Sequence, residues 1–347
     1  MCSKRSLSGA PPGGGALRGA VISRRRAARR RPPDVRADSE RKHARGGVYA
    51  RLAWHCHCAR AAVMRDCARG DDAAAELTRC ICRGIAEGGA ALSELIEVAP
   101  GVLVATSRKM ATNSTVISAN GHALLVDPGW LPDELEDLAA EIERRRLTVI
   151  GGFATHAHHD HLLWHPRFGD APRWASDQTA HLAVAERPTL VEFLGADFPG
   201  ELVDLMGRVA AVGSAIPAAS VPEGIDVELI VHDGHAPGHT ALWLPQQRVL
   251  LAGDMLSDIE LPLPFYPDDL PAYIAALDLL APYAAEARVV VPGHGTVGTD
   301  ASARLDADRG YLDDMILRGD SDDPRASLPG MAEAHVHMRE VARGHRA

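Results

Sequence analysis

Four short apolar segments each end within two residues of an aspartate or a histidine, and this placement constrains the fold more than any other feature of the chain. The segments and the residues that follow them are 124–126 before Asp127, 149–154 before the cluster 156–161, 249–253 before Asp254 and 289–293 before His294. Short apolar runs of this kind are typical of strands buried on both faces. Because sites in α/β sheets form at the carboxyl ends of the strands, we expect these ionisable side chains to gather in one crevice.

From residue 92 onward the chain alternates short apolar runs with amphipathic segments, which is typical of an α/β fold. Leu135, Leu138 and Ile142 recur at helical spacing with charged residues between them, so residues 132–146 are predicted to form an amphipathic helix. Strands are predicted at 96–107, 114–117, 122–126, 148–154, 227–231, 241–244, 249–252 and 289–291. Further helices are predicted within 179–218 and at 270–284 and 303–317.

The N-terminal quarter of the chain differs from the rest in charge and in the pattern of its apolar residues. Residues 1–92 hold 17 Arg and 2 Lys against 8 Asp or Glu, a net charge of +11, which leaves −20 for the remainder of a chain whose total is −9. Since it lacks sustained apolar periodicity, the basic, Cys- and Arg-rich segment 1–91 is predicted to be a disordered extension. The acidic remainder would repel phosphate backbones, which argues against a nucleic-acid partner.

All six cysteines lie in this basic segment, so the remainder cannot depend on disulfides of its own. We therefore expect a reducing compartment, the cytoplasm. The chain has no apolar run of eighteen or more residues, so no membrane span is expected. The basic segment has two interpretations: thiols in an unstructured region, or a zinc site of unusual spacing. Candidate ligands for such a site are His55, Cys56, His57, Cys58, Cys67, Cys80 and Cys82.

The segment His156-x-His158-x-Asp160-His161 has the spacing of a metal-binding loop. In an extended loop His156 and His158 point to the same side, so both imidazoles can bind one ion. Asp160 and His161 follow at an expected helix start, turned toward a neighbouring position where they can bind a second ion. Imidazole and carboxylate together suit zinc, with iron or manganese as alternatives.

The chain resembles the metallo-β-lactamase superfamily, of a glyoxalase II-like or general hydrolase type. The resemblance is carried by five motifs in the family's order: an aspartate after an early strand, H-x-H-x-D-H, a later histidine, an aspartate and a final histidine. The resemblance covers residues 92–318. It implies an α/β fold in the form of an αββα sandwich, in which two mixed β-sheets are flanked by helices. We expect residues 319–347 to form a C-terminal tail with a short helix.

The resemblance also implies a pair of metal ions, two Zn²⁺ with Fe or Mn as alternatives. The implied ligands are His156, His158 and His239 for the first ion, Asp160, His161 and His294 for the second, and Asp254 as a bridge. Asp127 would lie behind the ligands and orient their loop. Two neighbouring dications would lower the pKa of a shared water and so supply hydroxide as the nucleophile, which Asp160 would help to orient. One metal would polarise the substrate carbonyl.

Several nearby residues compete for these roles. His235 precedes His239 by four residues, but the Gly-His-Thr motif around His239 fits the family pattern better, so His239 is the predicted ligand. His159 lies inside the motif at an alternate position and would face away. Tyr266 and Tyr273 are candidates for a substrate-facing hydroxyl, although packing is the favoured role for both. Surface or core positions are expected for His122, His165, His181 and His232.

The predicted activity is hydrolysis of a carboxylic ester, thioester or lactone, because the family's true β-lactamases usually lack an acid at the position of Asp254. Two alternatives use the same motif: a mononuclear iron enzyme that oxidises a persulfide with dioxygen, and a small phosphodiesterase. The expected partner is a small-molecule substrate. Apolar residues within 186–218 suggest that it carries an apolar acyl group, unless they only cover the sheet. The loop Arg108-Lys109-Met110 is predicted to be either a lid or a plain turn.

Overall fold

The computed structural model of the chain describes residues 95–264 and 268–346. All of them belong to one compact unit, His43–Ala347. The basic segment 1–91, with its candidate thiol ligands, lies outside the described residues, as does Tyr266.

The first half of the described chain forms a seven-stranded mixed sheet whose strands follow sequence order. Its strands are β1 (Ile96–Ala99), β2 (Val102–Thr106), β3 (Asn113–Ala119), β4 (His122–Val126), β5 (Thr148–Phe153), β6 (Arg173–Ser176) and β7 (Ala210–Val212). Strands β1 to β4 pair antiparallel, whereas β4 to β7 pair in parallel. Parallel neighbours need a crossover connection, and α4 (Pro132–Arg144) supplies the one between β4 and β5.

The second half forms a four-stranded mixed sheet in the order β11-β10-β9-β8. Its strands are β8 (Glu228–His232), β9 (His239–Leu244), β10 (Val249–Gly253) and β11 (Val289–Pro292). Strands β8, β9 and β10 are antiparallel neighbours, and β11 lies parallel to β10. The crossover between β10 and β11 contains α8 (Leu270–Glu286).

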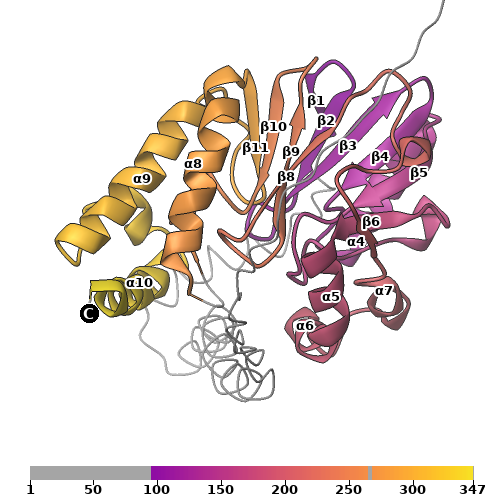
Figure 1. The fold of residues 1–347 in the computed structure, drawn as a ribbon. Helices are drawn as coiled ribbons and strands as arrows, with labels where there is room; N and C mark the ends of the chain where they lie inside the picture. The colour runs from indigo at the N-terminus through magenta and orange to yellow at the C-terminus, as the bar shows by residue number, and fades with distance from the viewer. Residues whose placement is uncertain (1–94, 265–267, 347) are drawn as a thin grey trace, which may run out of the picture. The chain divides into compact units, whose positions relative to one another are not determined.

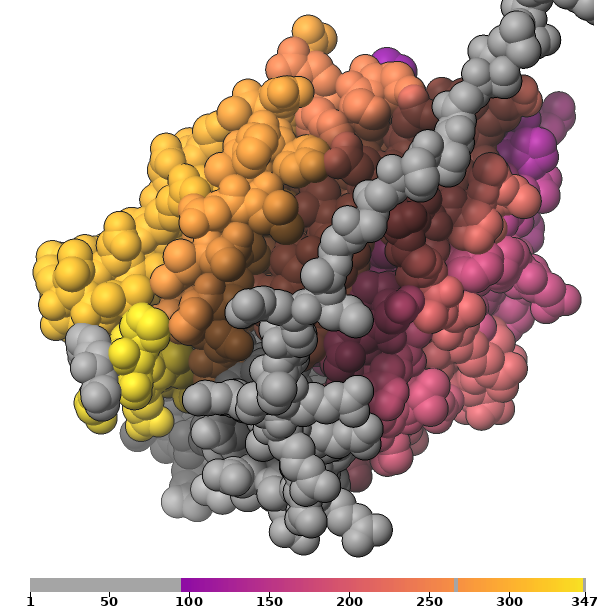
Figure 2. Space-filling model, viewed as in Figure 1, coloured from indigo at the N-terminus to yellow at the C-terminus, as the bar shows by residue number. Residues whose placement is uncertain are grey.

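Helices cover the outer face of each sheet (Figure 1). The helices on the first sheet are α4, α5 (Asp177–Ala185), α6 (Arg187–Leu194) and α7 (Gly200–Leu205), and those on the second are α8, α9 (Ala301–Leu317) and α10 (Met331–Arg346). The space-filling view shows the first half in magenta on one side and the second half in orange to yellow on the other (Figure 2). The predicted αββα sandwich is confirmed.

The continuous apolar runs explain these four layers, because successive side chains of a strand point to opposite faces. In β4, Leu125 packs against the outer helices, while Leu124 packs between the sheets. In β10, Leu250 faces the outer helices and Leu251 faces the other sheet. An apolar residue is therefore needed at each of these positions, which is why these strands show no polar alternation.

The first predicted strand, 96–107, is two strands, β1 and β2, joined by a tight turn at Gly101. Gly101 has φ +74°, and a Cβ there would collide with the carbonyl oxygen of Ser118. The predicted helical region 179–218 contains α5, α6 and α7 but also the three-residue strand β7. Strands β6 and β7 escaped prediction because three or four residues are too few to establish a period.

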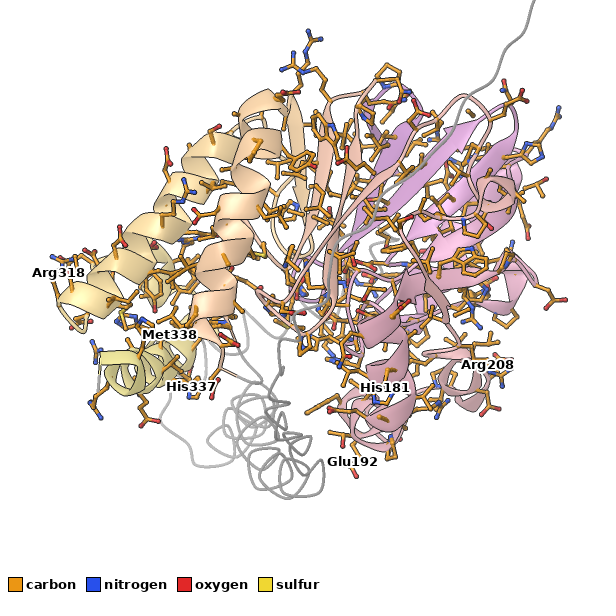
Figure 3. The ribbon with its side chains drawn as sticks, in the orientation of Figure 1. His181, Glu192, Arg208, Arg318, His337 and Met338 are labelled. Atoms are coloured by element: carbon orange, nitrogen blue, oxygen red, sulfur yellow. The ribbon has the colours of Figure 1, made fainter. Side chains whose placement is uncertain are left out.

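The segment predicted as a C-terminal tail contains α10, a helix of 16 residues. Met331, Ala334, Met338 and Ala342 of this helix are buried in the apolar cluster shared with α8 and α9. Figure 3 shows Met338 on this helix, below α9. The last residues of the fold thus contribute to the core of the second half.

Candidate metal centre

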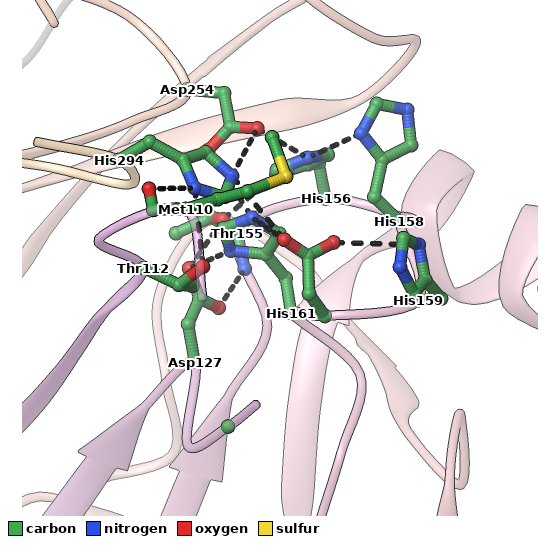
Figure 4. Close-up of polar contacts among 12 residues, drawn as sticks. Met110, Thr112, Asp127, Thr155, His156, His158, His159, His161, Asp254 and His294 are labelled. Atoms are coloured by element: carbon green, nitrogen blue, oxygen red, sulfur yellow. Dashed lines mark hydrogen bonds and ion pairs between the residues drawn. The ribbon is translucent and has the colours of Figure 1, made fainter. Parts of the chain in front are cut away.

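The ends of four strands bring the predicted ionisable residues to one edge of the two sheets (Figure 4). Asp127 follows β4, the loop 156–161 follows β5, Asp254 follows β10 and His294 follows β11. The connection between β8 and β9 reaches the same edge, because β9 runs antiparallel to β10 and begins where β10 ends. The expectation that strand ends gather these residues is met.

Four side chains, three buried and one half-buried, form a first group of donor atoms: His156, His158, His235 and Asp254. The Nδ1 atom of His158 lies 2.9 Å from His156 Nε2 and 3.2 Å from His235 Nε2. Asp254 Oδ2 lies 3.4 Å from the Nε2 atoms of both His156 and His235. Three imidazoles and one carboxylate form a ligand set of the kind that binds zinc.

Asp160, His161 and His294 form a second buried group. Asp160 Oδ2 lies 3.4 Å from His161 Nε2 and 3.2 Å from His294 Nε2. Asp254 faces this group as well, with Oδ1 at 3.2 Å from His161 Nε2 and Oδ2 at 3.4 Å from His294 Nε2. Asp254 therefore lies between the two groups, the place that the resemblance implies for a bridging ligand.

Asp127 lies behind the ligands and fixes two of them. Its Oδ2 lies 2.9 Å from His161 Nδ1 and accepts a hydrogen bond of 2.6 Å from the hydroxyl of Thr155. The same hydroxyl lies 3.0 Å from His156 Nδ1. An ionised carboxylate can only accept hydrogen bonds, so Nδ1 of His161 carries the proton. The Thr155 hydroxyl already donates its hydrogen to Asp127, so it accepts a hydrogen bond from Nδ1 of His156. Both Nε2 lone pairs then face the site.

Backbone carbonyls fix two further ligands in the same way. His235 Nδ1 lies 2.9 Å from the carbonyl oxygen of Leu263, and His294 Nδ1 lies 3.2 Å from that of Met110. Because a carbonyl oxygen only accepts, each Nδ1 is the protonated nitrogen and each Nε2 presents a lone pair to the cluster. Thr112 Oγ1 lies 3.1 Å from the same nitrogen of His294.

The structure brings His235, and not the predicted His239, into the first group. His239 is fully buried at the start of β9, opposite His232 of β8. Its Nδ1 lies 3.3 Å from His232 Nε2, and its Nε2 accepts a hydrogen bond of 3.1 Å from the backbone N–H of Asp254. The ring of His239 stacks on that of His156 with 5.0 Å between centroids, so His239 borders the first group, but its donor atoms belong to none of the groups. The geometry favours His235, the weaker candidate of the pair on sequence grounds.

The electrostatics separate the two groups. Burial lowers the pKa of His158 well below 6.5 and that of His235 to about 3, so both are neutral, as metal ligation requires. Burial also opposes charge at His161 and His294, yet the neighbouring carboxylates raise the pKa of both well above its ordinary value. The second group is therefore a place where the acids stabilise positive charge.

Two buried polar atoms at the junction of the groups, His161 Nε2 and Asp254 Oδ1, lie 3.2 Å apart and make no hydrogen bond within residues 95–264 and 268–346. Leaving such atoms unpaired inside a protein costs free energy, about 1–3 kcal/mol each. A metal ion between them would be bound by both, because it would replace the proton on His161 Nε2 and meet the negative charge of Asp254. The residues present thus fit a dinuclear metal site, with His and Asp donors in two buried clusters.

Close backbone packing at this edge requires glycine at two positions. Gly253 has φ +54°, and a Cβ there would overlap the ring of His239. A Cβ on Gly293 would overlap Asp254 Oδ1. Each glycine precedes a donor residue and lets its strand end approach the neighbouring one.

One acidic residue of the cluster was absent from the sequence predictions. Glu260 is buried, and a carboxylate oxygen of its side chain lies within 4.8 Å of donor atoms of Asp254 and His294. Burial raises its pKa to about 7. Glu260 lies in a loop, six residues after Asp254, so no strand end or spacing rule marked it.

Aromatic rings and one ammonium group border the second group. The Trp130 ring lies 4.9 Å from that of His159 and 6.4 Å from that of His294, centroid to centroid. Phe193 extends this surface, with its ring 5.5 Å from that of His159. Lys109 Nζ lies 4.0 Å from the centroid of the Trp130 ring. His159 therefore faces this aromatic surface and belongs to neither donor group.

The loop predicted as a lid or a turn is attached to the site. Arg108 donates a hydrogen bond of 2.6 Å to Asp133, and its backbone N–H donates to Glu134. Met110 is 43% exposed, while its carbonyl oxygen lies against His294, so the loop overhangs one of the donor residues (Figure 4). Tyr273 is buried in the core of the second half, in agreement with the favoured packing role, and His181 is exposed on α5 (Figure 3).

The model of the metallo-beta-lactamase superfamily matches residues 108–294, more than half of the chain. The chain therefore belongs to the metallo-beta-lactamase superfamily, and it is a metallo-hydrolase of that fold with buried His and Asp clusters. A metallo-beta-lactamase family protein from Thermus thermophilus has a similar structure, with a TM-score of 0.53 and 18% sequence identity, covering 72% of this chain and 95% of that chain. A beta-lactamase domain protein from Burkholderia ambifaria gives a TM-score of 0.52 and 19% identity, covering 75% and 90%. At these identities the likeness shows the fold alone. The search of curated proteins finds no match.

Proposed function

We propose that the protein is a dinuclear metal-dependent hydrolase of a carboxylic ester, thioester or lactone. The observation that carries the proposal is the position of Asp254, whose two oxygens face two separate groups of donors. A mononuclear site would leave the second group, Asp160, His161 and His294, as a buried collection of acids and imidazoles without a cation.

The proposed ligands are His156, His158 and His235 at the first position, Asp160, His161 and His294 at the second, and Asp254 at both. We expect two Zn²⁺, with Fe or Mn as alternatives. When bound, such ions lower the pKa of a shared water toward neutrality and so provide a nucleophile at physiological pH. Asp127 and Thr155 hold the ligand rings in one tautomer, which keeps the site ready to bind metal without rearrangement.

The surroundings support a small substrate with an apolar acyl group. The rings of Trp130 and Phe193 offer flat apolar contact beside the second group, and Met110 adds a flexible apolar side chain. Lys109 is the cation nearest to this surface among the contacts described, and it suits a substrate that also carries an anionic group. Among the described residues, no helix is long and apolar enough to cross a membrane. A nucleic-acid partner is not expected, and cytoplasmic location stays a prediction.

The test combines metal analysis with a substrate panel. Purified protein should contain two equivalents of metal per chain and hydrolyse a member of a panel of esters, thioesters and lactones. Asp160→Ala should abolish turnover, whereas Asp197→Ala, at an exposed aspartate of the same half, should not. One iron per chain with persulfide oxidation would support the dioxygenase instead, and turnover confined to phosphodiesters would support the phosphodiesterase. Protein free of transition metal and indifferent to chelators would refute all three.

A further inference from the structure

Glu260 is a buried acid that lies beside the second group, next to Asp254 and His294. Its side chain belongs with Asp254 and His294 to a third group of donor atoms, all within 4.8 Å of one another. No hydrogen bond from another residue of the described part of the chain reaches its carboxylate. A buried carboxylate without a hydrogen-bond donor needs a neighbouring positive charge, and a metal ion at the second position would supply one.

The backbone around Glu260 is held firmly. Its N–H donates a hydrogen bond of 3.0 Å to the hydroxyl of Ser257, which itself donates to the carbonyl oxygen of His294 at 2.7 Å. Its carbonyl oxygen accepts a hydrogen bond of 3.0 Å from Nη1 of Arg325. The main chain is thus fixed at a constant position beside the second group, while the carboxylate stays available.

We propose that Glu260 is an additional carboxylate ligand at the second metal position. This inference rests on the proposed dinuclear function and extends it. The position would then have five protein donors, namely Asp160, His161, Asp254, Glu260 and His294. Three of them are carboxylates, which is a harder, more oxygen-rich set than at the first position, where three imidazoles and one carboxylate converge.

The two positions should therefore prefer different metals. Zinc sites have four ligands, typically nitrogen or sulfur with few oxygens, whereas carboxylate-rich sites of higher coordination number suit manganese and ferrous iron. We expect Zn²⁺ at the first position, and Mn²⁺ or Fe²⁺ to compete effectively at the second. Asp254 Oδ1 supports this assignment, because it faces the second position at 3.2 Å from His161 Nε2 and makes no hydrogen bond within the described part of the chain.

The test compares Glu260→Gln with Glu141→Gln in the full chain, after removal of metal by a chelator and titration with Mn²⁺ in the presence of one equivalent of Zn²⁺. Glu141, on α4, is a matched control because it is also buried but pairs with Arg145, which follows the helix. Glu260→Gln keeps size and removes the charge. It should weaken the Mn²⁺ equivalent at least 10-fold and leave the Zn²⁺ equivalent in place, and Glu141→Gln should change neither. Electron paramagnetic resonance of Mn²⁺ measures this binding without any substrate.

The outcomes separate the two proposals. If the wild-type chain binds two metals and Glu260→Gln binds both with unchanged affinity, the role of Glu260 is refuted while the dinuclear function stands. If the wild-type chain binds no second equivalent, both are refuted. Should Glu260→Gln fail to fold, the absorption spectrum of the wild type with Co²⁺ decides: weak bands from the second equivalent support five or more ligands, and intense tetrahedral bands overturn the proposal.

Discussion

The choice between His235 and His239 yields a sharp prediction, because two histidines four residues apart have opposite surroundings. His235 Nε2 is one of four donor atoms of the first group, whereas the nitrogens of His239 contact His232 and the backbone N–H of Asp254. Binding of zinc to a four-ligand protein site is worth about 10–16 kcal/mol. An equal share per ligand is about 3 kcal/mol, so His235→Gln should weaken the first zinc about 100-fold.

His239→Gln provides the matched control. An amide oxygen at this position can still accept from the backbone N–H of Asp254, so the effect should stay within about 10-fold, at the low end for residues that support ligands. Both variants are titrated with Zn²⁺ against a chromophoric chelator, and circular dichroism confirms that both fold. If His239→Gln loses the first zinc while His235→Gln keeps it, the geometric assignment is wrong and the motif-based one is right.

Three further predictions concern the supporting residues. Asp127→Asn removes the charge that holds one proton on His161. The variant should have a metal affinity or kcat/KM about 10- to 100-fold lower, measured by metal titration and kinetics. Wild-type values in the variant would contradict the orienting role of Asp127. Arg325→Met leaves the carboxylate of Asp308 buried without its 2.6 Å partner and should lower the free energy of unfolding, measured by urea denaturation, by about 3 kcal/mol. Full or partial recovery of stability in the double variant with Asp308→Asn would identify the buried charge as the cause. An unchanged urea midpoint in Arg325→Met would exclude it. Burial lowers the pKa of His232 to about 4, below its value of about 6.5 in the unfolded chain, so the unfolded state binds more protons between these values and stability falls as pH falls. Between pH 7 and pH 4.5 the metal-free wild type should lose about 2 kcal/mol more than His232→Gln in the same assay, and parallel losses would show that this histidine is not responsible.

The sequence was informative where a strand end and a reactive side chain coincide. Each of β4, β5, β10 and β11 is a short apolar run with an ionisable residue within three positions of its end, and both features follow from burial of the strand and exposure of its end. The gathering of Asp127, Asp254 and His294 could therefore be predicted without any contact information, whereas the four-layer sandwich was implied only by the resemblance to the superfamily.

The histidine of the β8–β9 connection shows the limit of this reasoning. The choice between His235 and His239 depends on which residue begins β9. A residue inside the strand packs between the neighbouring strands, while one in the preceding loop reaches the edge of the sheet where the donor atoms lie. Strand boundaries are the least certain part of a sequence prediction, and a shift of a few residues exchanges His239 for His235. Glu260 was not predicted as a site residue for a related reason, because only the tertiary structure brings its loop back to Asp254.

The α10 segment was underestimated because its apolar residues are mainly alanine and methionine, which form a weak pattern next to many charges. Burial of this face depends on a partner surface formed by α8 and α9, and that surface exists only in the folded chain. Prediction from the segment alone could therefore find a helix but not its docking.

Arg325, just before α10, couples this docking to the chemistry of the protein. Its guanidinium donates to the backbone carbonyl oxygens of Ser257 and Glu260, so the loop leading away from Asp254 is hydrogen-bonded to the turn that precedes the C-terminal helix. If undocking of the helix loosens that loop and weakens metal affinity, thermodynamic reciprocity requires that metal strengthen docking by the same factor. Amide hydrogen exchange along the helix would then register ion occupancy, although the helix itself offers no ligand to either group.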